Sequence, residues 1–233
     1  WEPVKDRFEY NFEHLGELGA SVCVLFEGEM VVDLWAGDRD TDGNPWLADT
    51  IAVINSCTKG GVALACHLLA DRGLLDLDAP VFEIWPEFSH GAKADVTTRM
   101  MLNHTTGVAA FRDDLPDGSA LDWDYMCDRV AAEEPWWEPG TRNGYHLMSF
   151  GWVAGELVRR ASGRNLGTFF REEVAEPVDA DFWIGLPADE HHRVSPLRPF
   201  RPDKNEKFAA FTNAFLADPT GLQGRAWRNR GGA

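Results

Sequence analysis

The order of apolar and polar positions predicts a β-hairpin near the start of the chain. Residues 21–26 and 30–37 are rich in β-branched and apolar side chains, and only a short Glu-Gly-Glu segment separates them. Residues 5–18 are predicted to form a helix that leads into this hairpin. The apolar residues 51–54, which follow a turn-rich loop, predict a third strand. The front of the chain is therefore expected to combine one helix with three strands.

Helical patterns dominate the remainder of the chain. Helices are predicted over residues 60–73, 97–103, 123–134, 149–161 and 165–174. Thr97 is a predicted N-cap, and Gly163 is predicted to end the fourth of these helices. Residues from 196 onward carry no assignable pattern. The order of elements predicts an α/β (α+β) fold, with a mainly helical subdomain inserted after the helix predicted at residues 60–73.

Composition and charge limit the possible partners. The chain has 233 residues, of which 44% are hydrophobic, enough for a sizeable core. Its net charge of −16 would repel phosphate backbones, so no nucleic acid partner is expected. We interpret the charge as an acidic surface that aids solubility, with a preference for cationic substrates as the alternative. No apolar run reaches the roughly 18 residues of a transmembrane helix, and the start lacks a signal-peptide pattern. We therefore expect no membrane partner and a cytoplasmic location.

The cysteines argue against a metal site. Cys23, Cys57, Cys66 and Cys127 are scattered and show no zinc-binding spacing. Buried free thiols are the expected state, which fits a reducing cytoplasm. No metal or other cofactor is predicted.

The spacing Ser-x-x-Lys at Ser56 and Lys59 is the strongest chemical signal. Positions three apart share a helix face, so the hydroxyl and the amine are expected to lie side by side. A neutral amine can activate a serine nucleophile, and the helix dipole together with burial would favour that neutral form. The structural alternative is a capping serine with a surface lysine. Cys57 is a rival nucleophile, but its two-residue offset from Lys59 faces away on a helix.

Tyr145 is the candidate proton partner of this pair. It precedes the helix predicted at 149–161, in a turn where a side chain can point into a cleft. A phenol near a lysine can share its proton and act as an acid or a base. Taken alone, a core tyrosine with a satisfied hydroxyl is the ordinary alternative.

Several short motifs follow one another along the chain. They are Ser56-Cys57-Thr58-Lys59-Gly60, the run from Gly73 to Val81, the run from Met101 to Gly107, Glu138-Pro139-Gly140 and Tyr145-His146. In this order and spacing they resemble the class C β-lactamase-like serine hydrolases. The stretch from Tyr145 to Arg160, followed by Gly163, resembles the family VIII carboxylesterases most closely. The resemblance covers residues 10–187.

This resemblance implies a β-lactamase/transpeptidase-like fold, with an antiparallel sheet flanked by helices plus a helical subdomain. It also implies a role for each motif residue. Ser56 would be the nucleophile that forms an acyl-enzyme, and its backbone N–H would be one oxyanion donor. Lys59 would be the adjacent general base or would keep the proton of Tyr145 mobile. Tyr145 would take the serine proton and return it to the leaving alcohol. His146, His104 and Thr106 are expected to stabilise the structure around the site.

The resemblance also implies a division of the chain. Residues 1–75 are expected to form the N-terminal part of the α/β domain with the nucleophile helix. Residues 76–187 would form a mainly helical subdomain with the tyrosine motif, and residues 188–233 would begin a return to the α/β domain. The family's third motif, Lys-Thr-Gly or His-x-Gly, does not follow Tyr145. We expect that motif, the second oxyanion donor and the remaining strands to lie after Ala233.

The sequence departs from the family at Leu147. In β-lactamases of this group the tyrosine motif reads Tyr-x-Asn, and the Asn contacts the lactam amide. Leu147 at that position favours an ester over a β-lactam substrate. Trp123 and Trp136 fall in the segment that borders the acyl pocket in this fold, so they are candidate substrate-binding residues, with ordinary core packing as the alternative.

The expected function is that of a serine carboxylesterase. It would cleave small-molecule esters with short acyl chains through an acyl-enzyme on Ser56, without a metal. One alternative is a β-lactamase or a D-amino-acid peptidase of the penicillin-binding type. Another is a non-catalytic relic. The sequence determines neither the natural substrate nor the oligomeric state.

Overall fold

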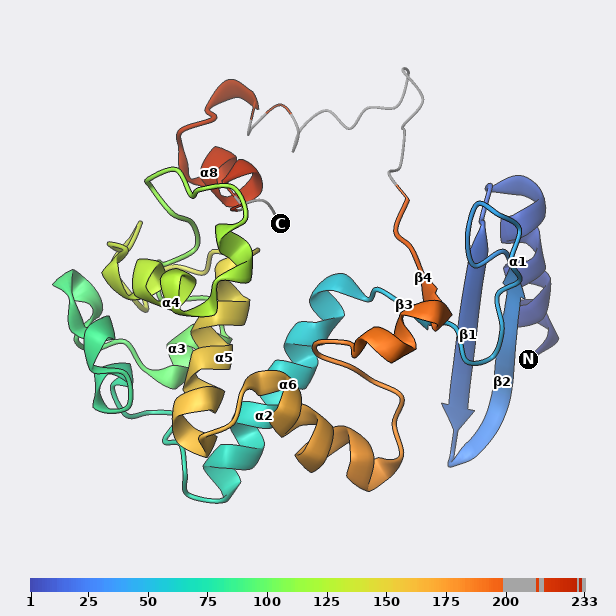
Figure 1. Ribbon diagram of the computed structural model, residues 1–233, viewed down its shortest axis with the longest axis horizontal. Coiled ribbons are helices and arrows are strands. Elements are labelled where there is room, and N and C mark those ends of the chain that lie inside the picture. Colours follow the sequence, from blue (N-terminus) through green and yellow to red (C-terminus); the bar gives the residue numbers. More distant parts are fainter. Residues whose placement is uncertain (199–212, 214–215, 230, 232–233) are drawn as a thin grey trace. The chain divides into compact units, whose positions relative to one another are not determined.

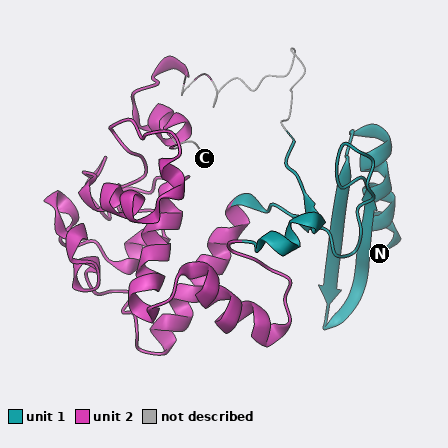
Figure 2. Cartoon of the chain, viewed as in Figure 1, with its two compact units in different colours: residues 1–55, 186–201 teal, residues 56–185, 202–233 magenta. Residues whose placement is uncertain are grey.

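The computed structural model describes residues 1–198, 213, 216–229 and 231. Two compact units are present, one of residues 1–55 with 186–201 and one of residues 56–185 with 202–233 (Figure 2). The fold is of the mixed α/β kind that the sequence predicts. The first strands lie in one unit and most helices in the other.

The unit with the chain start contains a helix and a hairpin. Helix α1 (Glu2–His14) lies alongside strands β1 (Gly19–Phe26) and β2 (Glu29–Gly37), which pair antiparallel (Figure 1). Glu27 and Gly28 turn the chain with φ of 51° and 84°. Two successive left-handed residues are what a tight hairpin turn requires. The predicted helix and hairpin are therefore confirmed.

The third predicted strand exists but is short. Strand β3 (Ile51–Ala52) pairs in parallel with β4 (Val194–Ser195). The apolar pattern continues to Ile54, but the ladder does not. Asn55 has a left-handed φ of 47°, which redirects the chain directly after the apolar run.

The helices of the second unit follow the predicted order. They are α2 (Thr58–Asp71), α3 (Thr98–Leu102), α4 (Trp123–Ala132), α5 (Ser149–Ser162), α6 (Leu166–Phe170) and α8 (Leu222–Arg228). The side chain of Thr97 caps α3 by accepting the Met100 N–H, and Gly163 ends α5 with φ of 73°, both as predicted. Helix α6 is shorter than predicted because the chain continues as a π-helical turn over Arg171–Ala175. Helix α8 lies in the tail that carried no assignable pattern.

Helix α5 is the central helix of this unit. Phe150, Ala154 and Val158 face one buried cluster, which also contains residues of α2 and α6. Val153 and Leu157 face a second cluster, built with α4 and the segments around residues 81–115. Apolar side chains on both faces are typical of a helix enclosed by its neighbours. Because α2 packs on α5 and α6, the unit boundary falls just before Ser56, whereas the sequence grouped this helix with residues 1–75. The three-segment division stays a prediction.

Two of the four cysteines are buried and two are exposed. Cys66 and Cys127 are buried, and burial raises the pKa of the Cys66 thiol to about 12. Cys23 and Cys57 are exposed. The prediction of buried thiols is therefore wrong for these two, because Cys57 lies in the turn before α2 and Cys23 lies on the exposed face of β1.

Within the described ranges, no helix has both the length and the hydropathy that crossing a membrane requires.

Candidate active site

Ser56 lies in a sharp turn at the start of α2. A one-turn 3₁₀ helix over Asn55–Cys57 leads directly into α2. The left-handed φ of 47° at Asn55 is a conformation that asparagine tolerates better than most residues. Strained backbone of this kind is concentrated at functional sites. The turn leaves Ser56 exposed while the following helix is anchored in the core.

Lys59 joins the serine to the tyrosine segment. Its Nζ donates to Ser56 Oγ at 3.0 Å and to the Leu147 carbonyl oxygen at 3.3 Å. The same nitrogen lies 4.8 Å from the ring centroid of Tyr145 and 5.5 Å from that of Phe150. One half-buried amine thus contacts the hydroxyl and is enclosed by two aromatic faces, an arrangement that orients it toward Ser56.

Tyr145 completes the cluster. Partial burial alone would raise its pKa, but hydrogen bonds with Ser56 and Lys59 and the positive charge of Lys59 outweigh this, and the net pKa is lowered. The side chain remains 47% exposed. Tyr145 therefore lies beside the Lys59 amine, has a lowered pKa and remains open to solvent. The structure brings together the three side chains that the sequence selected as catalytic candidates.

A buried histidine holds the loop behind Tyr145. The Nδ1–H of His146 donates to the Gly144 carbonyl at 2.8 Å, and its Nε2 lies 2.7 Å from Thr106 Oγ1. With Nδ1 carrying the proton, Nε2 accepts from the Thr106 hydroxyl. Burial, with smaller contributions from His104 and Lys59, lowers the pKa of His146 to about 4. The ring is therefore neutral, and its burial and two hydrogen bonds agree with the structural role that the sequence predicts.

His104 supports the same loop from the other side. Its Nδ1 accepts the His146 N–H at 3.2 Å, and its ring centroid lies 4.9 Å from that of Tyr145. Burial and the nearby charge of Lys59 lower the pKa of His104. The residue has a left-handed φ of 65°. A neutral, strained histidine thus packs against the tyrosine ring and keeps it in place.

The two candidate substrate-binding tryptophans lie elsewhere in the same unit. Trp123 donates from Nε1 to Glu156 at 2.9 Å and packs against the inner core. Trp136 donates to the Ala110 carbonyl at 2.8 Å and lies under the guanidinium of Arg112. Both indole N–H groups are therefore used within the protein. A substrate-binding role for these two residues stays a prediction.

A cavity of about 360 Å³ opens beside Tyr145. The lining comprises Ala109, Asn143, Gly144, Tyr145, Leu147, Leu222, Gln223, Ala226 and Trp227. Leu147 contributes here from the position where the family pattern has Asn. Such a volume is at the low end of those that hold small organic ligands. Neither Trp123 nor Trp136 lines it.

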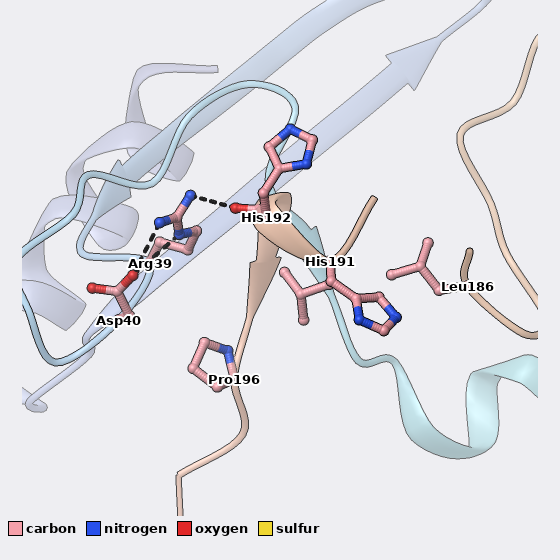
Figure 3. A pocket seen from close by; sticks show the side chains of 7 residues that line it. Arg39, Asp40, Leu186, His191, His192 and Pro196 are labelled. Carbon is pink, nitrogen blue, oxygen red and sulfur yellow. Dashed lines mark hydrogen bonds and ion pairs between the residues drawn. The ribbon is translucent and has the colours of Figure 1, made fainter. Parts of the chain in front are cut away.

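A second cavity lies in the other unit and has different chemistry. Figure 3 shows Arg39 between Asp40 and His192; the guanidinium donates to the carboxylate at 3.1 Å and to the His192 carbonyl at 2.7 Å. Asn44 donates to the same carboxylate and lowers its pKa. The charged groups are thus paired with one another, and no nucleophile with an adjacent base lines this cavity. Over the whole described part of the chain, no cluster of His, Cys, Asp and Glu side chains has the makings of a metal site.

The sequence reasoning missed three contributors to the site. The Leu147 backbone carbonyl and the Phe150 ring both contact the Lys59 amine. Phe150 reads as an ordinary core residue of its helix, and a backbone acceptor has no sequence signature. The third contributor is α8, whose residues reach the cavity from a stretch without an assignable pattern.

Comparisons with known proteins agree with this geometry. A protein-family model described as Beta-lactamase matches residues 8–215. The "Esterase/beta-lactamase LipL" of Mycobacterium tuberculosis is 40% identical over 182 residues, which cover 77% of this chain and 42% of the relative. The "Esterase EstB" of Burkholderia gladioli is 33% identical over 179 residues, covering 69% of this chain and 45% of the relative. A solved structure described as a family VIII carboxylesterase superimposes with a TM-score of 0.81 and 42% identity, covering 97% of this chain and 62% of that one.

This chain spans less than half the length of the two curated relatives named above. The activity of those longer proteins is therefore only a proposal for this chain.

Proposed function

The chain belongs to the beta-lactamase family, and on that premise we propose that it is a serine hydrolase that cleaves carboxylic esters with short acyl chains. The observation that carries the proposal is the contact of Lys59 Nζ with Ser56 Oγ at 3.0 Å, with the Tyr145 ring centroid 4.8 Å from the same nitrogen. A hydroxyl bonded to an amine, with a phenol of lowered pKa beside that amine, has the partners that a serine nucleophile needs.

In the first half-reaction Ser56 Oγ attacks the ester carbonyl carbon. Tyr145 takes the hydroxyl proton while the Lys59 charge stabilises the phenolate. The carbonyl oxygen becomes an oxyanion, for which the Ser56 backbone N–H at the start of α2 is a donor. When the tetrahedral species collapses, the bond to the alcohol oxygen breaks, and Tyr145 returns the proton to that oxygen. The products are a free alcohol and an acyl group on Ser56.

The second half-reaction repeats these steps with water. Tyr145 accepts a proton from a water molecule, whose oxygen attacks the acyl carbon. The bond to Ser56 Oγ then breaks, and the proton passes to the serine. The net change is hydrolysis of one ester to an acid and an alcohol, with no cofactor required. The 47% exposure of Tyr145 supports this half-reaction, since water can approach the base.

Two findings favour an ester as the substrate. Both curated relatives carry esterase in their names. Leu147 adds an apolar side chain to the cavity at the position where the family pattern has an amide-binding Asn. An apolar side chain cannot replace the hydrogen bonds that a lactam amide requires.

Substitution of Ser56 tests the proposal directly. Ser56→Ala should abolish the hydrolysis of p-nitrophenyl butanoate, while the thermal unfolding curve stays unchanged because the side chain is exposed. Cys57→Ala is the matched control, since this exposed neighbour is the rival nucleophile, and it should retain activity. Full activity of a folded Ser56→Ala variant would overturn the proposal. A fluorescent phosphonate should label the native protein and not the variant; failure to label the native protein would indicate a non-catalytic relic.

A second candidate function is β-lactam hydrolysis. It is favoured by the double name of the relative from Mycobacterium tuberculosis. Turnover of nitrocefin measured beside p-nitrophenyl butanoate separates the two activities, and we expect the ester to be the better substrate. A higher kcat/KM for nitrocefin would reverse the order of the two candidates.

A further inference from the structure

Helix α8 supplies one wall of the cavity beside Tyr145. Leu222, Gln223, Ala226 and Trp227 line it. Counted from Leu222, the other three follow after one, four and five residues, so the four side chains form one continuous face of the helix. The opposite wall comes from the loops that carry Tyr145 and Ala109. The cavity therefore has a reactive side and a side without any chemical group of the mechanism.

Another face of α8 fastens the helix to the body of its unit. Asn229, directly after the last turn, accepts the Leu115 N–H at 2.8 Å on its Oδ1. Its Nδ2 donates to the carbonyl oxygens of Phe111 at 3.0 Å and Asp113 at 2.6 Å. Arg225, four residues earlier, pairs with the carboxylate of Asp114. One amide side chain thus makes three hydrogen bonds to a single loop, a bonding pattern that fixes both position and rotation.

The lining chemistry identifies what the cavity can accept. Apolar side chains on the α8 face, chiefly Leu222 and Trp227, oppose the apolar Leu147. None of the lining side chains carries a fixed charge. A cavity of about 360 Å³ with this lining suits an apolar substituent of a few carbon atoms rather than an ionic group.

We propose that Trp227 and Leu222 are the specificity-determining residues of this site and limit the length of the apolar substituent of the ester. Asn229 is the positioning residue that acts through them by holding α8 in place. This inference rests on the proposed function, because it assigns the substrate class of that same site. It goes further by placing the selectivity in a segment that takes no part in the chemistry.

Two ester series distinguish which substituent occupies the cavity. In the first, the p-nitrophenyl esters of acetate, butanoate and octanoate vary only the acyl chain. In the second, ethyl, butyl and octyl acetate vary only the alcohol. Trp227→Ala and Leu222→Ala should raise the ratio of kcat/KM for the long over the short substituent by about tenfold in one series, the usual worth of one or two methylenes in a pocket. A ratio that stays within about twofold of the native value in both series would overturn the proposal, since differences of that size are below what a pocket change produces.

Asn229→Ala tests the positioning role separately. It should shift the kcat/KM ratio of long over short esters in the same direction as Trp227→Ala and leave kcat and KM for p-nitrophenyl acetate unchanged, because acetate does not reach the α8 face. Asn165→Ala is the matched control: that side chain caps α6 with a hydrogen bond to the Thr168 N–H at 2.8 Å. The control should lower stability without altering the substrate ratio. An equal loss toward all esters in Asn229→Ala would mean that the residue acts only in folding.

Leu121→Ala controls for the removal of an apolar side chain, because Leu121 is 92% exposed and does not line the cavity. A binding measurement separates failure of this inference from failure of the proposed function. In the Ser56→Ala background, butanoate should bind more tightly than octanoate by NMR titration, and Trp227→Ala should reduce or reverse that difference. Length-dependent binding in a protein without esterase activity would uphold the α8 wall and reject the esterase.

Discussion

Helix α5 borders two polar clusters of opposite construction. At its N-terminal end, Phe150 lies under the amine of Lys59, which touches the exposed Ser56. Two turns further on, the fully buried carboxylate of Glu156 accepts hydrogen bonds from Arg159, Arg160 and the Trp123 indole, all between 2.6 and 2.9 Å. The cluster around Lys59 leaves the Ser56 hydroxyl open to solvent, whereas the carboxylate of Glu156 is closed to solvent.

The pKa values follow from this difference. Burial alone would raise the pKa of Glu156, but hydrogen bonds from Arg159, Arg160 and Trp123 lower it to about 2. That carboxylate is locked in one charge state and contributes only to stability. The pKa of Tyr145 is lowered by Ser56 and Lys59 against partial burial, while the side chain stays half-exposed. The structural cluster around Glu156 thus has its hydrogen bonds satisfied within the protein, whereas the reactive cluster around Lys59 can still bond a substrate or water.

The largest expected effect is on activity at the open cluster. Lys59→Met keeps an unbranched apolar side chain and removes the amine that lies near the two aromatic rings. We expect kcat/KM for p-nitrophenyl butanoate to fall about 10³-fold while the free energy of unfolding changes by less than about 0.5 kcal/mol. Steady-state kinetics and urea unfolding measure the two quantities. Lys5→Met on the exposed α1 is the control, and a loss of less than about threefold in Lys59→Met would remove the distinction between the clusters.

The opposite result is expected at the closed cluster. Glu156→Ala leaves two arginines without their shared carboxylate and should lower the free energy of unfolding by about 3 kcal/mol. Activity per folded molecule should stay near the native value. Glu172→Ala is the matched control, because that carboxylate pairs with Arg164 at the surface and should cost less than about 1 kcal/mol. Equal losses in the two variants, measured by urea unfolding, would contradict the structural role of Glu156.

Acid should remove the stabilising contributions of His146 and Glu156 in different pH ranges. The pKa of His146 falls from 6.5 to about 4 on folding, so between these values the unfolded chain binds a proton that the folded chain does not. Stability from this group is complete above about pH 6.5 and is lost as the pH falls toward 4, about 3 kcal/mol in all. For Glu156 the window is lower, from 4.5 to about 2. Unfolding free energies measured from pH 7 to 4 should slope in the native protein and less in His146→Gln; an unchanged slope would exclude His146 as the cause.

The smallest expected effect is the loss of stability when one neutral hydrogen bond is removed, and it serves as the reference for the losses above. Thr97→Ala removes the side-chain acceptor for the Met100 N–H at the start of α3. The expected cost is about 1 kcal/mol of stability, with kcat/KM unchanged. Thr97→Ser keeps the hydroxyl and should recover most of the loss in a thermal melt. A cost as large as that of Glu156→Ala would show that the ion cluster adds nothing beyond ordinary capping.

Local features of the fold were predictable because neighbours in the chain decide them. The hairpin is confirmed since the Glu27-Gly28 turn and the flanking apolar runs agree. The cap at Thr97 and the end at Gly163 follow from short-range backbone bonding. The length of β3 was wrong, because strand pairing depends on β4, more than 140 residues away along the chain, and on the left-handed turn at Asn55.

The candidate site shows the same division. A spacing of three residues in a helix brings Ser56 and Lys59 together, and the sequence is sufficient for that contact. The approach of Tyr145 to the pair could be expected only through the resemblance to a family. The sequence does not show that the indole N–H groups of Trp123 and Trp136 bond Glu156 and the Ala110 carbonyl, and the substrate-binding role of both residues stays a prediction.

What the sequence alone determined is therefore the order of elements, the caps and the Ser-x-x-Lys pair, all of which depend on bonds across a few residues. Only the tertiary structure decided which acceptor the Lys59 amine meets across 88 residues of chain, which carboxylate is buried, and that α8 closes the cavity beside Tyr145. These contacts join segments distant in sequence, and their energies come from packing and desolvation, which no local pattern encodes.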